Sequence, residues 1–108
     1  MSVNSFAILA FVDELWELVR GVPVGKVVSY GALGSALSRP LTGRVVGRLM
    51  ASCPDDIPWW RVVAESGALP IWKRGPAAGA RQEELLRQEG VPIEGGIVDM
   101  SRFSVEPY

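Results

Sequence analysis

The chain has 108 residues, of which 48% are hydrophobic and 21% charged, and its formal net charge is −1, as in an ordinary single globular domain. It contains no histidine and one cysteine, Cys53, which excludes an internal disulfide, a Cys/His zinc site and any catalytic unit of the Ser-His-Asp or Cys-His type. No apolar run nears the roughly 18 residues of a membrane span, so we expect no membrane association. We also expect no metal and no cofactor.

The N-terminal segment predicts one helix and a short extended connection. Apolar residues recur at helical spacing over residues 3–20, and Gly21 and Pro23 end the run. Residues 24–28 are rich in valine, which favours extended backbone.

Two short helices are predicted next, each with its own N-cap. Ser29 is a good cap for a helix over residues 30–37, and Thr42 is a good cap for a helix over residues 43–51. Pro40 separates them, because the residue before a proline is disfavoured in the helical region. Two short helices joined by a few residues with such a breaker are typical of a helix-turn-helix.

The second half of the chain predicts strands and a final helix. Residues 59–63 and 68–72 predict a small β-hairpin, and residues 79–88 predict a helix that Gly90 ends. We expect the tail, residues 91–108, to pack onto this body within one domain. The fold class is therefore mainly α with a small β-hairpin, a winged-helix-like helix-turn-helix domain of the DNA-binding type.

Charge is unevenly distributed along the chain. Residues 1–19 carry three acidic and no basic side chains, residues 20–74 carry eight basic and three acidic, and residues 75–108 carry three basic and six acidic. A basic centre between acidic ends can face a polyanion while the net charge stays near zero. The alternative is an ordinary solvated surface with uneven charge.

Two arginines lie on one face of the second short helix. Arg44 and Arg48 have the i,i+4 spacing that places side chains together. Gly43 and Gly47 would leave the surface of this helix thin, so that a phosphate backbone could approach it closely. A plain helical pair, with its glycines packed against a neighbour, is the alternative.

Five motifs in a fixed order carry a resemblance to the DNA-binding domain of the O6-alkylguanine-DNA alkyltransferases, over about residues 6–90. They are Val-Val-Ser-Tyr at 27–30, Gly-Arg-Val-Val-Gly at 43–47, Ile-Pro-Trp-Trp-Arg-Val-Val at 57–63, Ser-Gly-Ala-Leu at 66–69 and Leu-Leu-Arg-Gln-Glu-Gly at 85–90. Together these motifs are much more specific than any one of them.

The chain departs from that family at the reactive residues. In the family, a cysteine after Ile-Pro takes the alkyl group and the histidine that follows helps to deprotonate it. Here Trp59 stands at the cysteine position and Trp60 at the histidine position, and Ala51 replaces an asparagine. An indole offers only an N–H donor and no nucleophile. The chain therefore resembles the alkyltransferase-like proteins, which do no alkyl transfer, and we interpret Glu89, which matches the glutamate of the family's proton relay, as structural.

The resemblance assigns DNA-binding roles to the helix-turn-helix, which the family places in the minor groove. Arg44 matches the arginine that fills the gap left by a flipped nucleotide, and Tyr30 matches a tyrosine that crowds the neighbouring phosphate. An ordinary phosphate contact for Arg44 and a core contact for Tyr30 are the alternatives. The other residues implied to contact DNA are Ser29, Thr42, Gly43, Gly47 and Arg48.

A lesion pocket is implied at Tyr30, Trp59, Val62 and Trp72. Flipping a base costs a few kcal/mol, and stacking on an aromatic ring returns roughly 1–3 kcal/mol per base. Adjacent side chains of a regular strand point to opposite faces, so we expect Trp59 to face the pocket and Trp60 to pack behind it. Without the resemblance, these tryptophans would be interpreted as ordinary core or surface residues.

The expected function is a non-enzymatic sensor that binds O6-alkylguanine in double-stranded DNA by nucleotide flipping and signals to nucleotide excision repair proteins. We expect a monomer in the cytoplasm, associated with the nucleoid if the source is prokaryotic, because a lone thiol fits a reducing compartment. Two alternatives stay open. One is a helix-turn-helix regulator without lesion specificity, and the other is a residual transferase that uses Cys53.

Overall fold

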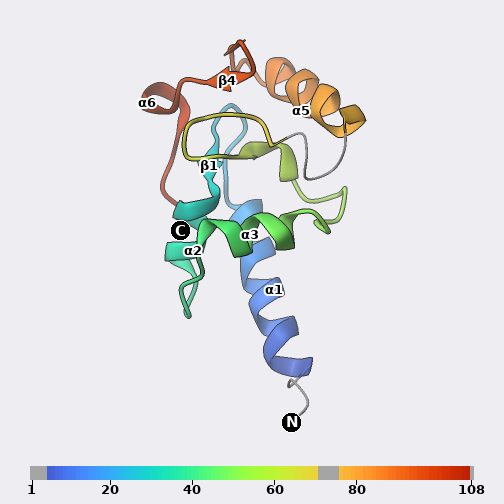
Figure 1. Ribbon diagram of the computed structural model, residues 1–108, viewed down its shortest axis with the longest axis vertical. Coiled ribbons are helices and arrows are strands. Elements are labelled where there is room, and N and C mark those ends of the chain that lie inside the picture. Colours follow the sequence, from blue (N-terminus) through green and yellow to red (C-terminus); the bar gives the residue numbers. More distant parts are fainter. Residues whose placement is uncertain (1–4, 71–75, 108) are drawn as a thin grey trace.

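The computed structural model describes residues 5–70 and 76–107, with backbone alone for residues 5–11 and 76. Figure 1 shows the N-terminal part of helix α1 projecting away from the body, which is built from the C-terminal part of α1 and the remaining elements. The elements are α1 (Ser5–Arg20), β1 (Val28–Ser29), α2 (Tyr30–Ala36), α3 (Gly43–Met50), the 3-10 turn η1 (Trp59–Arg61), β2 (Val62–Val63), α5 (Pro76–Gln88), β3 (Ile93–Glu94), β4 (Ile97–Val98) and α6 (Met100–Phe103).

The predicted helix-turn-helix is confirmed by α2 and α3. The Ser29 hydroxyl accepts a hydrogen bond from the Ala32 amide at 3.1 Å, and the Thr42 hydroxyl accepts one from the Val45 amide at 3.3 Å. These bonds satisfy first-turn amides that have no partner within the helix. Both helices pack on the C-terminal part of α1, where Leu15 is fully buried, and this main core positions the exposed side of α3.

The predicted hairpin over residues 59–72 is wrong in its location. Residues 59–61 form a 3-10 turn, closed by the Arg61 amide bonding to the Pro58 carbonyl at 3.1 Å. Among the described residues of that segment, the strand is β2, which pairs in parallel with β1, with Val28 opposite Val62, while Ala68 makes a single antiparallel bridge to Ile97. The partner strand is thus distant in sequence, which local alternation does not reveal. Residues 71–72 of the predicted second strand lie outside the described residues.

The hairpin of this fold lies nearer the C-terminus, between β3 and β4. Ile93 pairs with Val98 in antiparallel register. Gly95 and Gly96 form the turn with φ of 59° and 76°, as a two-residue hairpin of type I′ requires. Ile93 and Val98 enter a second buried cluster with Leu86 of α5.

The end of the chain returns to the body beside β1. The Val27 amide donates to the Phe103 carbonyl and the Val105 amide donates to the Val27 carbonyl, both at 2.9 Å. The predicted final helix begins at Pro76, three residues before its expected start, and Gly90 follows its end with φ of 86°. In the described part of the chain, no helix combines the length and apolar character needed to cross a bilayer.

Candidate nucleic-acid interface

The outer side of α3 presents the two predicted arginines. Arg44, Val45 and Arg48 are exposed, whereas Val46 is fully buried. This amphipathic pattern is what a period of 3.6 residues produces. Gly47 is buried on the inner side of α3, so it lies away from the exposed arginine face.

Gly43 allows the starts of α2 and α3 to approach each other. A side-chain carbon at residue 43 would lie 3.2 Å from the Gly31 amide nitrogen, tighter than ordinary van der Waals contact. Thr42 is exposed beside this junction. Ser29 is only 6% exposed, and its hydroxyl is used inside the protein, both by the Ala32 amide and by the Glu65 carboxylate.

A cleft of about 440 Å³ opens beside Arg44. Its lining includes Tyr30, Gly43, Arg44, Glu65, Leu69 and Pro70. The structure therefore brings together the predicted arginine and the predicted tyrosine, which come from different helices. We call this hollow the Arg44 cleft.

Both tryptophans of the 59–60 pair line a second hollow, which we call the Trp cleft. It measures about 540 Å³, and its lining includes Asp55, Trp59, Trp60, Ala78, Arg81 and Leu85. The two rings meet edge to face, with centroids 6.0 Å apart and planes 84° apart. The expectation that Trp60 packs behind Trp59 is wrong, because a 3-10 turn does not alternate side chains as a strand does.

The implied lesion pocket is divided among different places in the described residues. Tyr30 lines the Arg44 cleft, whereas Trp59 is 7% exposed, belongs to the main core and lines the Trp cleft. Val62 is 1% exposed within the same core. Trp72 lies outside the described residues.

A polar cluster from α5 fixes the backbone that carries the tryptophans. The Gln82 amide, almost fully buried, donates to the Trp60 carbonyl at 3.1 Å and to the Val62 carbonyl at 3.0 Å. The Trp60 indole donates to Glu89 at 2.8 Å, and the Arg61 guanidinium donates to the same carboxylate at 2.8 Å. Such contacts hold the η1 turn in one orientation.

Glu89 is held in its charged form. Partial burial by itself raises the pKa of this carboxyl, but hydrogen bonds from Arg61, Trp60 and the Gly25 amide outweigh it, so the pKa lies below its ordinary value. A carboxylate with these partners stays ionised and accepts hydrogen bonds, and it does not hold a proton for transfer. This geometry agrees with the structural role expected for Glu89.

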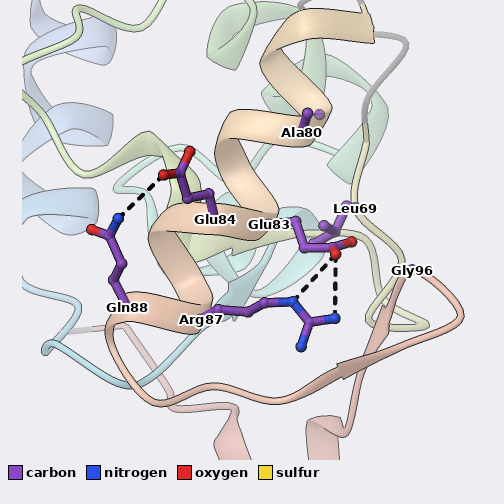
Figure 2. A pocket seen from close by; sticks show the side chains of 8 residues that line it. Leu69, Ala80, Glu83, Glu84, Arg87, Gln88 and Gly96 are labelled. Carbon is purple, nitrogen blue, oxygen red and sulfur yellow. Dashed lines mark hydrogen bonds and ion pairs between the residues drawn. The ribbon is translucent and has the colours of Figure 1, made fainter.

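The outer side of α5 has a different character. A cleft of about 810 Å³ is bordered by Glu83, Glu84 and Arg87 of α5 and by Leu69, and Figure 2 shows these side chains. Glu83 pairs with Arg87 at 3.2 Å. Because its carboxylates outnumber its cations, this cleft does not suit a DNA phosphate.

Comparison with known proteins decides the family. Residues 10–91 match the family described as 6-O-methylguanine DNA methyltransferase, DNA binding domain. The chain belongs to this family. An Escherichia coli relative named DNA base-flipping protein is 32% identical over 97 residues, which span 87% of this chain and 73% of the relative.

Alkyltransferase-like proteins are also among the similar proteins. Alkyltransferase-like protein 1 of Schizosaccharomyces pombe is 35% identical over 86 residues, spanning 77% of this chain and 78% of the relative. A crystal structure of S. pombe Atl1 in complex with damaged DNA containing O6-carboxymethylguanine aligns with a TM-score of 0.78 and 28% identity. The alignment covers 99% of this chain and 100% of that chain.

Sequence reasoning missed two polar residues of the site. Gln82 precedes Leu85 and Leu86 by three and four positions, so helical spacing already placed it on the buried side of α5. Glu65 lies between the two predicted strands 59–63 and 68–72, and no local pattern signals that its carboxylate meets Ser29, 36 positions away.

Proposed function

We propose that this protein is a non-enzymatic sensor of DNA damage that binds O6-alkylguanine in duplex DNA. It docks the exposed face of α3 in the minor groove, flips the damaged nucleotide and holds it without alkyl transfer. Support comes from the family membership and from relatives named for base flipping or for likeness to alkyltransferases. Signalling to nucleotide excision repair proteins is part of the same proposal.

One observation carries the proposal. Arg44 and Tyr30 line one cleft on the exposed side of the helix-turn-helix. An arginine beside a hollow can fill the gap in a base stack while the extruded nucleotide enters the hollow. Compensation of this kind is what base flipping needs, because unstacking and unpairing cost a few kcal/mol.

The absence of transfer follows from the residues at the acceptor position. The indole of Trp59 cannot accept an alkyl group by displacement. Cys53 is 3% exposed and belongs to the main core, so an alkyl donor would reach its sulfur only if that core opened. We therefore propose that the chain is not an enzyme.

A second candidate function is a helix-turn-helix regulator without lesion specificity. The burial of Trp59, and its place in a cleft whose described lining lacks Arg44, favour this candidate. Such a protein would prefer a base sequence and ignore alkylation.

A binding titration separates the two candidates. Two fluorescent duplexes of the same sequence are compared, one with a single O6-methylguanine and one with guanine. We expect at least tenfold tighter binding to the damaged duplex, since each aromatic contact to an extruded base contributes roughly 1–3 kcal/mol. Equal affinities on several sequences would reject the sensor.

Intact protein mass then tests for transfer. After incubation with the O6-methylguanine duplex, we expect the unmodified mass and an unchanged lesion in the recovered DNA. A gain of one methyl group would identify a transferase, and peptide mapping at Cys53 would locate the modification.

A further inference from the structure

A carboxylate lies inside the surface that is proposed to face DNA. Glu65 follows β2, and its Oε1 accepts a hydrogen bond from the Ser29 hydroxyl at 3.1 Å. Gly31 makes room for it, since any side chain at residue 31 would overlap the Glu65 carboxylate. The Ser29 hydroxyl is itself fixed by capping α2, so the carboxylate has a defined position at the junction of α2 and α3.

This position separates two hollows of the same surface. On one side Glu65 lines the Arg44 cleft together with Tyr30 and Arg44. On the other side it lines a cleft of about 580 Å³ with Ser29 and Ser35. The residue as a whole is exposed, so a DNA backbone laid over the starts of α2 and α3 would meet its charge.

The charge opposes what backbone binding requires. Duplex DNA carries one negative charge per roughly 1.7 Å of its axis, and the chain from Arg20 to Pro54 has no acidic residue. Glu65 thus places a negative charge beside the helices of this segment, and a second exposed carboxylate, Glu106, lines the cleft of about 580 Å³ with it. The energy of repulsion between a carboxylate and a phosphate is proportional to the inverse of the distance between them.

We propose that Glu65 is a specificity-determining residue that limits the affinity of this surface for any DNA backbone. A damaged duplex compensates for the repulsion through the contacts of its flipped base, whereas an undamaged duplex has no such compensation. At a given protein concentration, Glu65 thereby restricts stable binding to damaged DNA. The repulsion by Glu65 acts on every duplex, and only the compensation by the flipped base rests on the proposed sensor function.

The test uses Glu65→Gln and Glu65→Lys. Glu94→Gln on β3 is the control for Glu65→Gln, because it removes the same charge from an exposed residue that lies outside the helix-turn-helix and lines neither cleft of Glu65. At low salt we expect Glu65→Gln to bind undamaged duplex about three to ten times more tightly, and Glu65→Lys more tightly still. The slope of log affinity against log salt should steepen by up to about 0.9 for each unit of charge. Glu94→Gln should bind as the unchanged protein does.

Thermal melting first establishes that each variant is folded. Unchanged or weaker binding of undamaged duplex by folded Glu65→Gln would overturn the proposal, as would an equal gain in Glu94→Gln, which would reflect net charge alone. The sensor function fails separately. If the unchanged protein shows no lesion preference while Glu65→Gln still tightens duplex binding, the sensor is rejected and Glu65 remains a limit on backbone affinity.

Discussion

Glu89 and Arg61 form a salt bridge of 2.8 Å in which each side chain is only 12% exposed. The pair joins the end of α5 to the η1 turn, and Arg61 also donates to the Val22 carbonyl at 2.8 Å. Glu89 also accepts a hydrogen bond from the Trp60 indole at 2.8 Å. Because neither an indole nor a guanidinium gives up its proton near neutral pH, these contacts serve to hold the structure together.

Removing the charge of Glu89 should destabilise the protein. Glu89→Gln leaves the largely buried guanidinium of Arg61 without its counter-ion, and we expect a loss of about 2–3 kcal/mol in the free energy of unfolding. Urea denaturation measures it. Glu84→Gln is the matched control, because Glu84 is exposed on α5, the helix that Glu89 directly follows, and it should change stability by less than about 0.5 kcal/mol.

The same carboxyl makes stability depend on pH. Its pKa is lower in the folded chain than its ordinary value of 4.5. The stabilisation is therefore complete above that ordinary value and disappears as the pH falls through the lower, folded pKa. Denaturation from pH 7 to pH 3 should show a fall in stability below about pH 4.5 that is smaller in Glu89→Gln. Identical pH profiles of the unchanged protein and Glu89→Gln would show that Glu89 does not cause the fall in stability.

Two glycines of α2 should respond differently to alanine. At Gly34 a methyl group would overlap the Leu41 carbonyl, and this backbone cannot move away because its amide is bonded to the Gly34 carbonyl at 3.1 Å. We expect Gly34→Ala to lose about 3 kcal/mol. At Gly31 the obstacle is the end of the Glu65 side chain, which can turn aside only by giving up its hydrogen bond from the Ser29 hydroxyl, so Gly31→Ala should lose about 1 kcal/mol. Melting temperatures of the two variants provide the comparison.

The helix-turn-helix was predictable because its signals are local. Ser29 and Thr42 each cap the helix that follows them, and Pro40 lies between the two helices. Helical spacing of apolar residues then fixed which side of α3 is exposed. Nothing distant in the sequence is needed for any of these features.

The sheet and the clefts were not predictable in the same way. Residues 62–63 pair with residues 28–29, so the strand depends on a contact across more than thirty positions. Gly95–Gly96 is a local hairpin signal, and it marks the hairpin that the structure contains. The 3-10 backbone of residues 59–61, which local alternation does not indicate, places Trp59 and Trp60 in one cleft.

Trp59 should contribute to stability, and its effect on lesion preference tests which cleft holds the flipped base. Because it is 7% exposed in the core, Trp59→Ala leaves a cavity and should lose about 3–5 kcal/mol. Trp59→Phe keeps an apolar ring and a folded chain, and we expect it to keep the lesion preference, since the described lining of the Arg44 cleft does not include Trp59. Trp60→Phe, which loses the bond to Glu89, should lower the melting temperature and keep the preference. A preference reduced severalfold in Trp59→Phe, at unchanged affinity for undamaged duplex, would place the flipped base in the Trp cleft instead.

Arg44 and Arg48 allow a test of the base-flipping role in which charge is matched. Both are exposed on α3, and each change to alanine removes one cation. An arginine that contacts a phosphate should, when changed, weaken binding of undamaged duplex and reduce the slope of log affinity against log salt by about 0.9. Arg44→Ala should in addition lose at least tenfold in affinity for the O6-methylguanine duplex, because the gap in the base stack then stays unfilled. Titrations of both duplexes at two salt concentrations separate the two effects. Equal losses for both arginines on both duplexes would reduce Arg44 to an ordinary phosphate contact.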